Sequence, residues 1–204
     1  MDWITALANE AKTSPVLRIR DLASKYHLSG SAVARALVRQ KKRGILEQLT
    51  SDTYLNKLAT AATPRDVLNT LVPHSYISLG TALAEWGLST QNPIATTAIS
   101  LSNIKKIKTP SIDILYRKIH RDLFWGFLEK KGRYASYKIA EPEKALLDWI
   151  YFRLKDGLPV EFDEIQFDKL SRSRLVAYAK KFPNTVIQTL FFPMLEGEIA
   201  NLRP

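Results

Sequence analysis

The 204-residue chain contains no cysteine. Disulfide bonds, thiol catalysis and cysteine-based zinc sites are therefore excluded. The sequence also lacks glycine-rich phosphate-binding loops, nucleophile elbows and zinc motifs. No apolar run approaches the roughly 18–20 residues that span a bilayer, and the first residues lack the apolar core of a signal peptide. From these absences we expect a soluble, cytoplasmic protein with no metal, no cofactor and no membrane contact.

Positive charge is in excess and is unevenly distributed along the chain. The formal net charge is +10. Residues 1–56 carry a net charge of +4 and residues 57–140 carry +7, whereas residues 141–204 carry −1. This distribution suggests a polyanionic partner for the first two-thirds of the chain. A generic basic surface would look similar, so charge alone supports nucleic-acid binding only modestly.

The stretch from Ile19 to Leu55 has the helix, turn, helix and hairpin pattern of a winged helix-turn-helix. In the first helix, apolar residues recur at the spacing of one buried face: Ile19, Leu22, Ala23 and Tyr26. Residues 27–30 form the turn, and Ser29 or Ser31 can cap the second helix. That helix is predicted to end at a left-handed Gly44, with a buried face of Val33, Ala36, Leu37 and Gln40.

Residues 45–49 and 54–55 are predicted to form the wing hairpin. A short strand at residues 16–18 could pair with it. Two features depart from the usual pattern. Gln40 is polar at a core position, and the wing turn at residues 50–53 contains no glycine, which makes its tight hairpin geometry less certain.

The opposite face of the second helix is predicted to enter the major groove of DNA. Arginine matches the two acceptors of guanine, and a small residue such as Ala32 can contact a thymine methyl group. Arg18 and Arg20 flank the entry to the first helix, where phosphate contacts are expected. The predicted DNA-binding residues are Arg18, Arg20, Ser29, Ser31, Ala32, Arg35, Arg39, Lys41, Lys42, Arg43, Thr50 and Ser51. The alternative is an ordinary solvated helix whose basic residues aid solubility.

We predict an α+β fold in which residues 1–56 form the winged helix-turn-helix domain. An opening helix completes that domain, and its predicted buried face consists of Ile4, Leu7, Ala8 and Ala11. Residues 57–204 are predicted to form a mixed α/β domain with a mostly helical C-terminal part. Its predicted helices start near Pro64, Ser78 and Pro142, its strands cover 94–101, 112–119, 123–129 and 134–139, and later helices cover 163–170, 173–182 and 184 onward.

Three segments of the second domain have more than one interpretation. Residues 130–133, Lys-Lys-Gly-Arg, are predicted to form a hairpin turn that is either a basic contact surface or merely a soluble turn. The helix that begins at Pro142 is interpreted as hydrophobic core. The apolar residues 189–192 belong either to the core or to an interface with another protein.

Several segments, taken together, carry a resemblance to a known family. They are the N-terminal winged helix, residues 75–79 (SYISL) with Ala82-Leu83 and Gly87-Leu88, the Thr96-Thr97 strand, and residues 139–148 (IAEPEKALLD). Over roughly residues 5–155, the chain resembles the AbiEi family of type IV antitoxins. The segment PEKAL, residues 142–146, is the most specific part of the resemblance.

The resemblance implies a bacterial or archaeal transcriptional autorepressor. Such a protein binds double-stranded DNA at inverted repeats upstream of a two-gene toxin–antitoxin operon. The second gene encodes a toxin of the nucleotidyltransferase class, in a system of abortive infection that acts in phage defence. The C-terminal domain is associated with countering that toxin. Whether the two proteins touch is left open.

Two other function classes compete with this interpretation. A nucleic-acid-processing enzyme would need titratable groups that converge in space. The sequence offers only His120-Arg121-Asp122 as a polar constellation, with His27 and His74 elsewhere, so we assign no catalytic residue. An RNA- or protein-binding regulatory module without operator specificity could use the basic middle region and residues 191–192.

Overall fold

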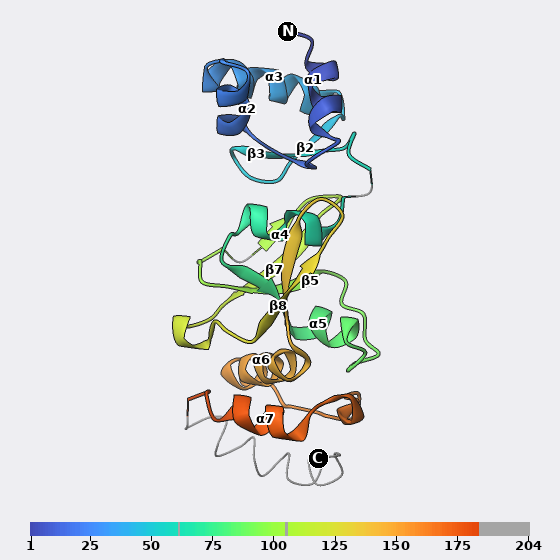
Figure 1. The fold of residues 1–204 in the computed structure, drawn as a ribbon, viewed down its shortest axis with the longest axis vertical. Coiled ribbons are helices and arrows are strands. Elements are labelled where there is room, and N and C mark those ends of the chain that lie inside the picture. Colours follow the sequence, from blue (N-terminus) through green and yellow to red (C-terminus); the bar gives the residue numbers. More distant parts are fainter. Residues whose placement is uncertain (61, 105, 184–204) are drawn as a thin grey trace. The chain divides into compact units, whose positions relative to one another are not determined.

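A computed structural model describes residues 1–60, 62–104 and 106–183 (Figure 1). This part of the chain is an α+β protein with seven α-helices, a three-stranded antiparallel sheet and a six-stranded mixed sheet. It forms two compact units, of which the first combines residues 1–73, 106–114 and 130–137. The second unit contains the remaining described residues. No helix in the described ranges is long and apolar enough to cross a membrane. The predicted boundary after residue 56 stays a prediction.

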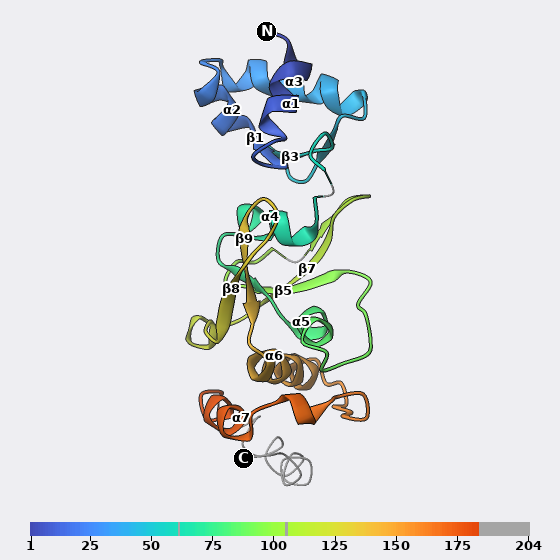
Figure 2. The same cartoon turned by 45° about the vertical axis from the view of Figure 1, so that its right-hand side comes forward.

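The N-terminal part of the first unit contains three helices and the smaller sheet (Figures 1 and 2). The helices are α1 (Trp3–Glu10), α2 (Ile19–Lys25) and α3 (Gly30–Lys42). The strands are β1 (Val16–Arg18), β2 (Leu46–Gln48) and β3 (Thr53–Asn56), in the order β1-β3-β2. Their shared core consists of Leu7, Leu17, Leu22, Val33, Leu37, Leu46 and Tyr54. The predicted helices, the β2–β3 hairpin and the strand at residues 16–18 are therefore confirmed.

Helix α3 follows its sequence pattern closely. Its buried side chains are the four predicted ones, and Ser29 caps it by accepting a hydrogen bond from the Ala32 N–H at 3.2 Å. After the helix, Gly44 adopts the left-handed region, with φ of +75°. Gln40 is only 5% exposed, and its Oε1 has no hydrogen-bond partner within the described part of the chain.

The predicted buried face of α1 is wrong at two positions. Ile4 is 48% exposed and Ala8 is exposed, whereas Ala6, Leu7 and Ala11 are buried. The half-buried Trp3 packs edge-on against Tyr26, with ring centroids 6.1 Å apart. The contact between Trp3 and Tyr26 therefore turns α1 so that another face is buried than the one predicted from its aliphatic residues.

Asp66 joins two distant segments within the first unit. It lies in the first turn of α4 (Pro64–Leu71), where its Oδ2 accepts hydrogen bonds from the Thr63 N–H and hydroxyl at 2.9 and 2.7 Å. Its Oδ1 accepts from the N–H groups of Arg133 and Tyr134, both at 3.1 Å. These residues belong to the turn between β8 (Phe127–Lys131) and β9 (Ser136–Ala140). One carboxylate therefore holds both a helix start and a hairpin turn.

The basic tetrapeptide predicted as a hairpin turn is placed differently by the structure. Lys130 and Lys131 belong to β8, and the turn covers residues 132–135. A Cβ atom on Gly132 would lie 2.5 Å from the carbonyl oxygen of Ala135 and 3.1 Å from Asp66 Oδ1. The turn therefore requires glycine at this position, which is the reason that the tight bend starts there and not earlier.

We predict that Asp66→Ala lowers the free energy of unfolding by about 1–3 kcal/mol, because it removes the helix cap and leaves two turn N–H groups without their acceptor. Burial acts to raise the pKa of Asp66, but its hydrogen bonds outweigh burial and hold the pKa below the ordinary 3.8. The stabilisation is thus present above pH 3.8 and is lost as the pH falls through the folded-state pKa. Urea unfolding at neutral and acidic pH tests this, with the exposed Asp163→Ala as control. Equal unfolding midpoints for the two variants at neutral pH would contradict it.

The larger sheet has the strand order β6-β7-β5-β4-β9-β8. Its other strands are β4 (Ser75–Ile77), β5 (Thr96–Ser100), β6 (Lys106–Lys108) and β7 (Asp113–Lys118). β4 pairs antiparallel with β5 and parallel with β9, where Ile77 lies opposite Ile139. The predicted strands at 94–101 and 112–119 are confirmed. In the predicted strand 123–129, a 3₁₀ turn at Arg121–Leu123 precedes β8, which starts only at Phe127.

The second unit contains the helices α5 (Leu79–Glu85), α6 (Pro142–Lys155) and α7 (Arg172–Ala179), and α6 packs against both other helices (Figure 1). The predicted helix 163–170 is wrong, since only a 3₁₀ turn at Phe167–Lys169 forms there. Ile165 instead makes a β-bridge with Ser89. The predicted helix at 173–182 forms as α7, which begins one residue earlier and is capped by Ser171, whose Oγ accepts a hydrogen bond from the Arg174 N–H. The segments predicted from residue 184 onward, including 189–192, lie outside the described residues.

Candidate nucleic-acid interface

The exposed face of α3 presents several of the side chains predicted to bind DNA. Ser31, Arg35 and Arg39 are exposed, while Ala32 is half-buried. The Oγ atoms of Ser29 and Ser31 lie 3.2 Å apart at the start of the helix. Because Val33, Ala36, Leu37 and Gln40 are buried, the helix cannot rotate without losing its core contacts. The outward direction of this face is therefore fixed by packing.

The cations of this face have no negative neighbours on their own helix, because α3 contains no acidic residue. Among the residues that the structure describes, the side chains of Arg35, Arg39, Lys42 and Arg43 take part in no hydrogen bond or ion pair. Lys41 differs, since its Nζ donates to Gln48 Oε1 at 2.7 Å. Four unpaired cations within nine residues favour an anionic partner.

Arg18 and Arg20, both predicted to contact phosphate, have internal partners. The half-buried Arg18 donates through Nη2 to the carbonyl of Thr70, in the last turn of α4. It thereby satisfies a carbonyl that the helix leaves without an N–H partner. Arg20 is exposed, and its Nε lies 3.3 Å from Asp21 Oδ1. Arg18 has a clear structural role, whereas the exposed pair of Arg20 costs little to break.

The turn between β2 and β3, predicted as the tip of a wing, closes without glycine through Asp52. Its Oδ1 accepts hydrogen bonds from the hydroxyls of Thr50 and Thr53 at 2.8 and 2.9 Å. These bonds hold the pKa of Asp52 below its ordinary value. Ser51 is exposed at the tip. The Asp52 carboxylate opposes a phosphate contact at this point, so Thr50 and Ser51 are less favourable anion ligands than their residue types suggested.

A second carboxylate anchors the same hairpin. Glu47, in β2, accepts hydrogen bonds from Ser111, at 3.0 Å from its N–H and 2.8 Å from its hydroxyl. Burial acts to raise the pKa of Glu47, but hydrogen bonds from Thr109 and Ser111 outweigh it and lower the pKa. Sequence reasoning missed this contact, because its partners are 64 positions apart.

The second unit contains a buried polar cluster around α6. Lys144 and Asp148 are both fully buried and form an ion pair. Asp148 Oδ2 also accepts from the hydroxyls of Tyr76 and Ser78 at 3.0 and 2.9 Å. Lys144 Nζ lies 3.1 Å from Tyr76 Oη and 4.9 Å from the ring centroid of Trp125. The cluster therefore ties α6 to β4 and the residue after it.

Burial controls the ionisation of this cluster. It lowers the pKa of Lys144 and raises the pKa of Asp148, while their mutual attraction opposes both changes. The interpretation of the Pro142 helix as pure hydrophobic core is therefore incomplete. A signal was present in the sequence: Lys144 and Asp148 are spaced i, i+4 and enclose Ala145, Leu146 and Leu147.

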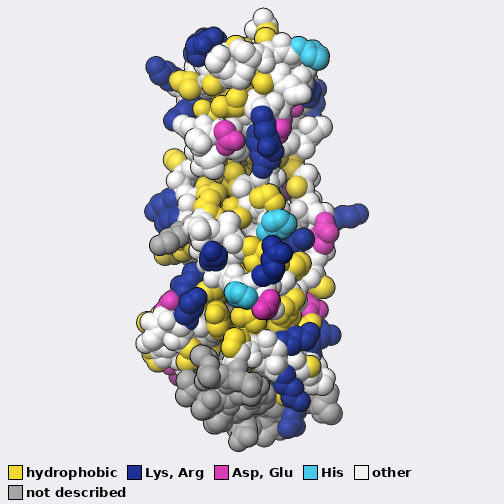
Figure 3. Space-filling view, turned by 90° about the vertical axis from the view of Figure 1, so that its left-hand side faces the viewer, with side chains coloured by type: hydrophobic (Ala, Val, Ile, Leu, Met, Phe, Trp, Pro, Cys, Tyr) yellow, Lys and Arg dark blue, Asp and Glu magenta, His cyan; other side chains and the backbone are white. Residues whose placement is uncertain are grey.

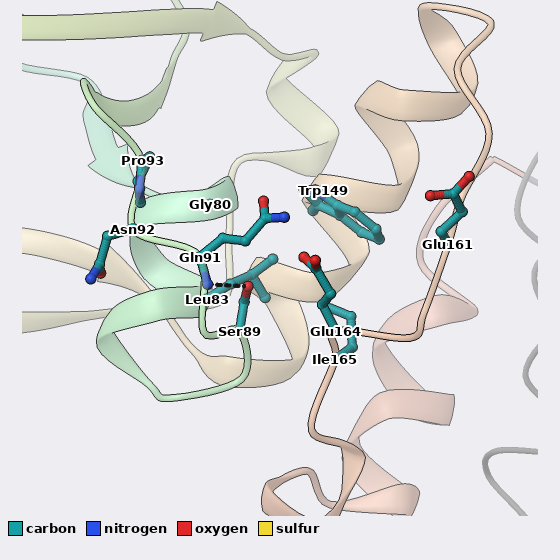
Figure 4. A pocket seen from close by; sticks show the side chains of 10 residues that line it. All are labelled: Gly80, Leu83, Ser89, Gln91, Asn92, Pro93, Trp149, Glu161, Glu164 and Ile165. Atoms are coloured by element: carbon teal, nitrogen blue, oxygen red, sulfur yellow. Dashed lines mark hydrogen bonds between the residues drawn. The ribbon is translucent and has the colours of Figure 1, made fainter.

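A small cavity of about 130 Å³ also lies in the second unit (Figure 4). The side chains of Gln91, Trp149 and Glu164 are directed toward one another across it, and Ser89 Oγ accepts from the Gln91 N–H at 3.1 Å. Glu161 contributes a second carboxylate. Elsewhere, His120 Nδ1 lies 3.3 Å from Asp122 Oδ2, with both side chains exposed. Within residues 1–60, 62–104 and 106–183, no three His, Asp or Glu side chains are grouped to hold a metal ion.

Surface charge does not single out an interface on the face of the molecule that Figure 3 draws. On the face drawn in Figure 3, Lys and Arg side chains are spread out and not gathered in one patch. A scan against protein-family models found no match, and a search of curated proteins found no significantly similar sequence. The functional argument therefore depends on the local geometry of individual residues, of which α3 offers the clearest set.

Proposed function

We propose that this protein is a sequence-specific DNA-binding repressor whose first residues act as a winged helix-turn-helix. In the proposal, α3 enters the major groove and the β2–β3 hairpin is the wing. The observation that carries it is a pair of exposed arginines, Arg35 and Arg39, which have no partner in the described part of the chain and lie on a helix without acidic residues. Each can donate two hydrogen bonds to a guanine edge, and Ser31 and Ala32 can contact neighbouring bases.

The remaining cations are proposed to position the protein on the phosphate backbone. Lys42 and Arg43 have no partner among the described residues that a phosphate contact would displace. Arg20 would give up only its exposed ion pair with Asp21. Lys41 and Thr50 would each have to give up an internal hydrogen bond. Arg18 would have to abandon a helix carbonyl, so we propose that it supports the domain and makes no phosphate contact.

We further propose that the protein is the antitoxin of a type IV system of the kind the AbiEi family represents. It would repress its own operon at inverted repeats and counteract a nucleotidyltransferase-class toxin. This part rests on the resemblance of residues 5–155, including the PEKAL segment whose lysine lies in the buried cluster. Direct contact with the toxin is not part of the proposal.

Operator binding is tested by footprinting the protein on the promoter of its own gene. We expect one protected region with inverted repeats, bound about a thousand-fold more tightly than bulk DNA at the same salt concentration. Equal affinity for promoter and bulk DNA would contradict a sequence-specific repressor.

The antitoxin role needs a separate test. The protein is co-expressed with a nucleotidyltransferase encoded next to its gene, and growth of the host is measured. We expect growth to be restored by the wild type and by Arg35→Ala, since repression and neutralisation are assigned to different parts of the chain. If growth stays arrested when the wild-type protein is co-expressed with the toxin, the antitoxin assignment is contradicted. The proposal of operator binding is not affected by that result.

A further inference from the structure

The first unit contains a groove that the proposed DNA contact does not use. It has a volume of about 440 Å³ and is lined by residues that include Lys12, Thr13, Leu58, Thr60, Arg133 and Tyr134. These residues come from the segment just after α1, the segment after β3 and the β8–β9 turn. We call it the α1–hairpin groove. None of its residues belongs to the predicted DNA-binding set.

Two exposed cations line the groove, and neither has a carboxylate partner. Lys12 Nζ donates only to Asn9 Oδ1, at 3.1 Å, and the Arg133 guanidinium carbon lies 5.8 Å from the ring centroid of Tyr134. Across residues 1–60, 62–104 and 106–183, no ion pair involves either side chain. Two uncompensated positive charges in a concave site favour a bound anion.

The groove is held in shape by hydrogen bonds to its backbone. The N–H groups of Arg133 and Tyr134 both donate to the buried Asp66. The Tyr134 hydroxyl donates to the carbonyl of Thr60 at 2.9 Å. On the other side, the Leu58 N–H donates to the side chain of the buried Asn56, which itself donates to the Leu7 carbonyl. The cations therefore project from a preorganised frame.

The groove also offers apolar surface next to its charges. Leu58 is 43% exposed, and the half-buried Tyr134 also lines the groove. An inorganic anion would use only the cations. A duplex would also use only the cations, because its phosphates face outward while its base faces are stacked. A single strand presents both phosphates and open base faces.

We propose that the α1–hairpin groove binds single-stranded nucleic acid, with Lys12 and Arg133 on backbone phosphates and Leu58 and Tyr134 against a base. Thr13 and Thr60 supply hydroxyl groups that can bond to a phosphate or a sugar. This goes beyond the proposed function, which concerns duplex DNA and a different surface.

The test is fluorescence anisotropy of the full chain with a labelled eight-nucleotide single strand, as RNA and as DNA. We expect Lys12→Ala/Arg133→Ala to weaken binding about tenfold and to reduce the slope of log affinity against log salt by about 1.4, since two strand phosphates lose their cations. Leu58→Asp, which puts a carboxylate in the groove, should weaken binding at least as much. The control Arg172→Ala/Lys180→Ala removes the same charge from exposed positions at α7 and should bind like the wild type.

Two results would overturn the proposal. One is equal binding by the groove variant and the α7 control. The other is competition by an eight-base-pair duplex as strong as that of the unlabelled single strand, which would mean that base faces are not contacted. Arg35→Ala should leave strand binding unchanged, so a failure of this proposal and a failure of operator binding are distinguishable.

Discussion

Asp148→Ala should lower the free energy of unfolding by about 3–5 kcal/mol. The substitution leaves the Lys144 ammonium fully buried, and among the described residues only the Tyr76 oxygen is then within hydrogen-bond distance and no counter-charge remains. It also removes the acceptor of the Tyr76 and Ser78 hydroxyls. An uncompensated buried charge is among the most destabilising changes a single substitution makes.

Urea unfolding followed by tryptophan fluorescence measures this effect, because Trp125 lies against Lys144. The control is the double substitution Lys144→Met/Asp148→Leu, which replaces the ion pair by apolar side chains of similar size. We expect the double variant to be more stable than Asp148→Ala, since no charge is left buried. If the double variant unfolds at the same or a lower urea concentration, the cost comes from the lost acceptor of the Tyr76 and Ser78 hydroxyls and not from the unpaired charge.

Arg35→Ala should weaken operator binding by about 1–3 kcal/mol, roughly 5- to 150-fold, and should relax the preference for one base pair. The side chain has no partner to lose among the described residues, so the protein itself should keep its stability. Affinity is measured by electrophoretic mobility shift on the operator and on operators that carry each base at one position.

Lys42→Ala provides the matched comparison on the same helix. As a phosphate contact, it should weaken binding to every sequence alike and reduce the salt slope by about 1. A uniform loss for Arg35→Ala, with unchanged base preference, would assign Arg35 to the backbone as well. Unchanged affinity for both variants would remove α3 from the interface.

The sequence predicted the structure best where the spacing of apolar residues determines a single helix. The buried face of α3, its Ser29 cap and its stop at Gly44 all follow from local spacing and local backbone chemistry. The same holds for the α4 start at Thr63-Pro64. Arg35 and Arg39 lie on the face of α3 opposite to the buried one, so the same pattern predicts that both are exposed.

Contacts between distant segments were not predictable from such patterns. Whether Arg18 faces solvent depends on the Thr70 carbonyl, 52 positions later. The helix that begins at Pro142 was interpreted as hydrophobic core, and that interpretation did not include the buried ion pair of Lys144 and Asp148. Their burial depends on Tyr76 and Ser78, which sequence spacing does not bring to α6.

Two predictions failed for related reasons, namely the buried face of α1 and the helix at residues 163–170. In α1, the aromatic contact of Trp3 with Tyr26 decided the buried face over the aliphatic pattern. At residues 163–170, the bridge of Ile165 to Ser89 and the hydrogen bond from the Gln166 N–H to the Leu88 carbonyl replaced helical bonds. A contact with a distant residue overrode the local apolar pattern in α1, and long-range pairing overrode helix propensity at residues 163–170.

The first unit is discontinuous along the chain, and this affects its biosynthesis. When residues 1–73 have left the ribosome, the residues that cap α4 are available. The turn N–H groups that bind Asp66, and Ser111, which binds Glu47, have not yet emerged. The Ser111 bonds need residue 111 to leave the exit tunnel, and the two N–H bonds to Asp66 form only after residue 134 has left it. The nascent N-terminal segment must therefore wait for more than sixty further codons before its last anchors are in place.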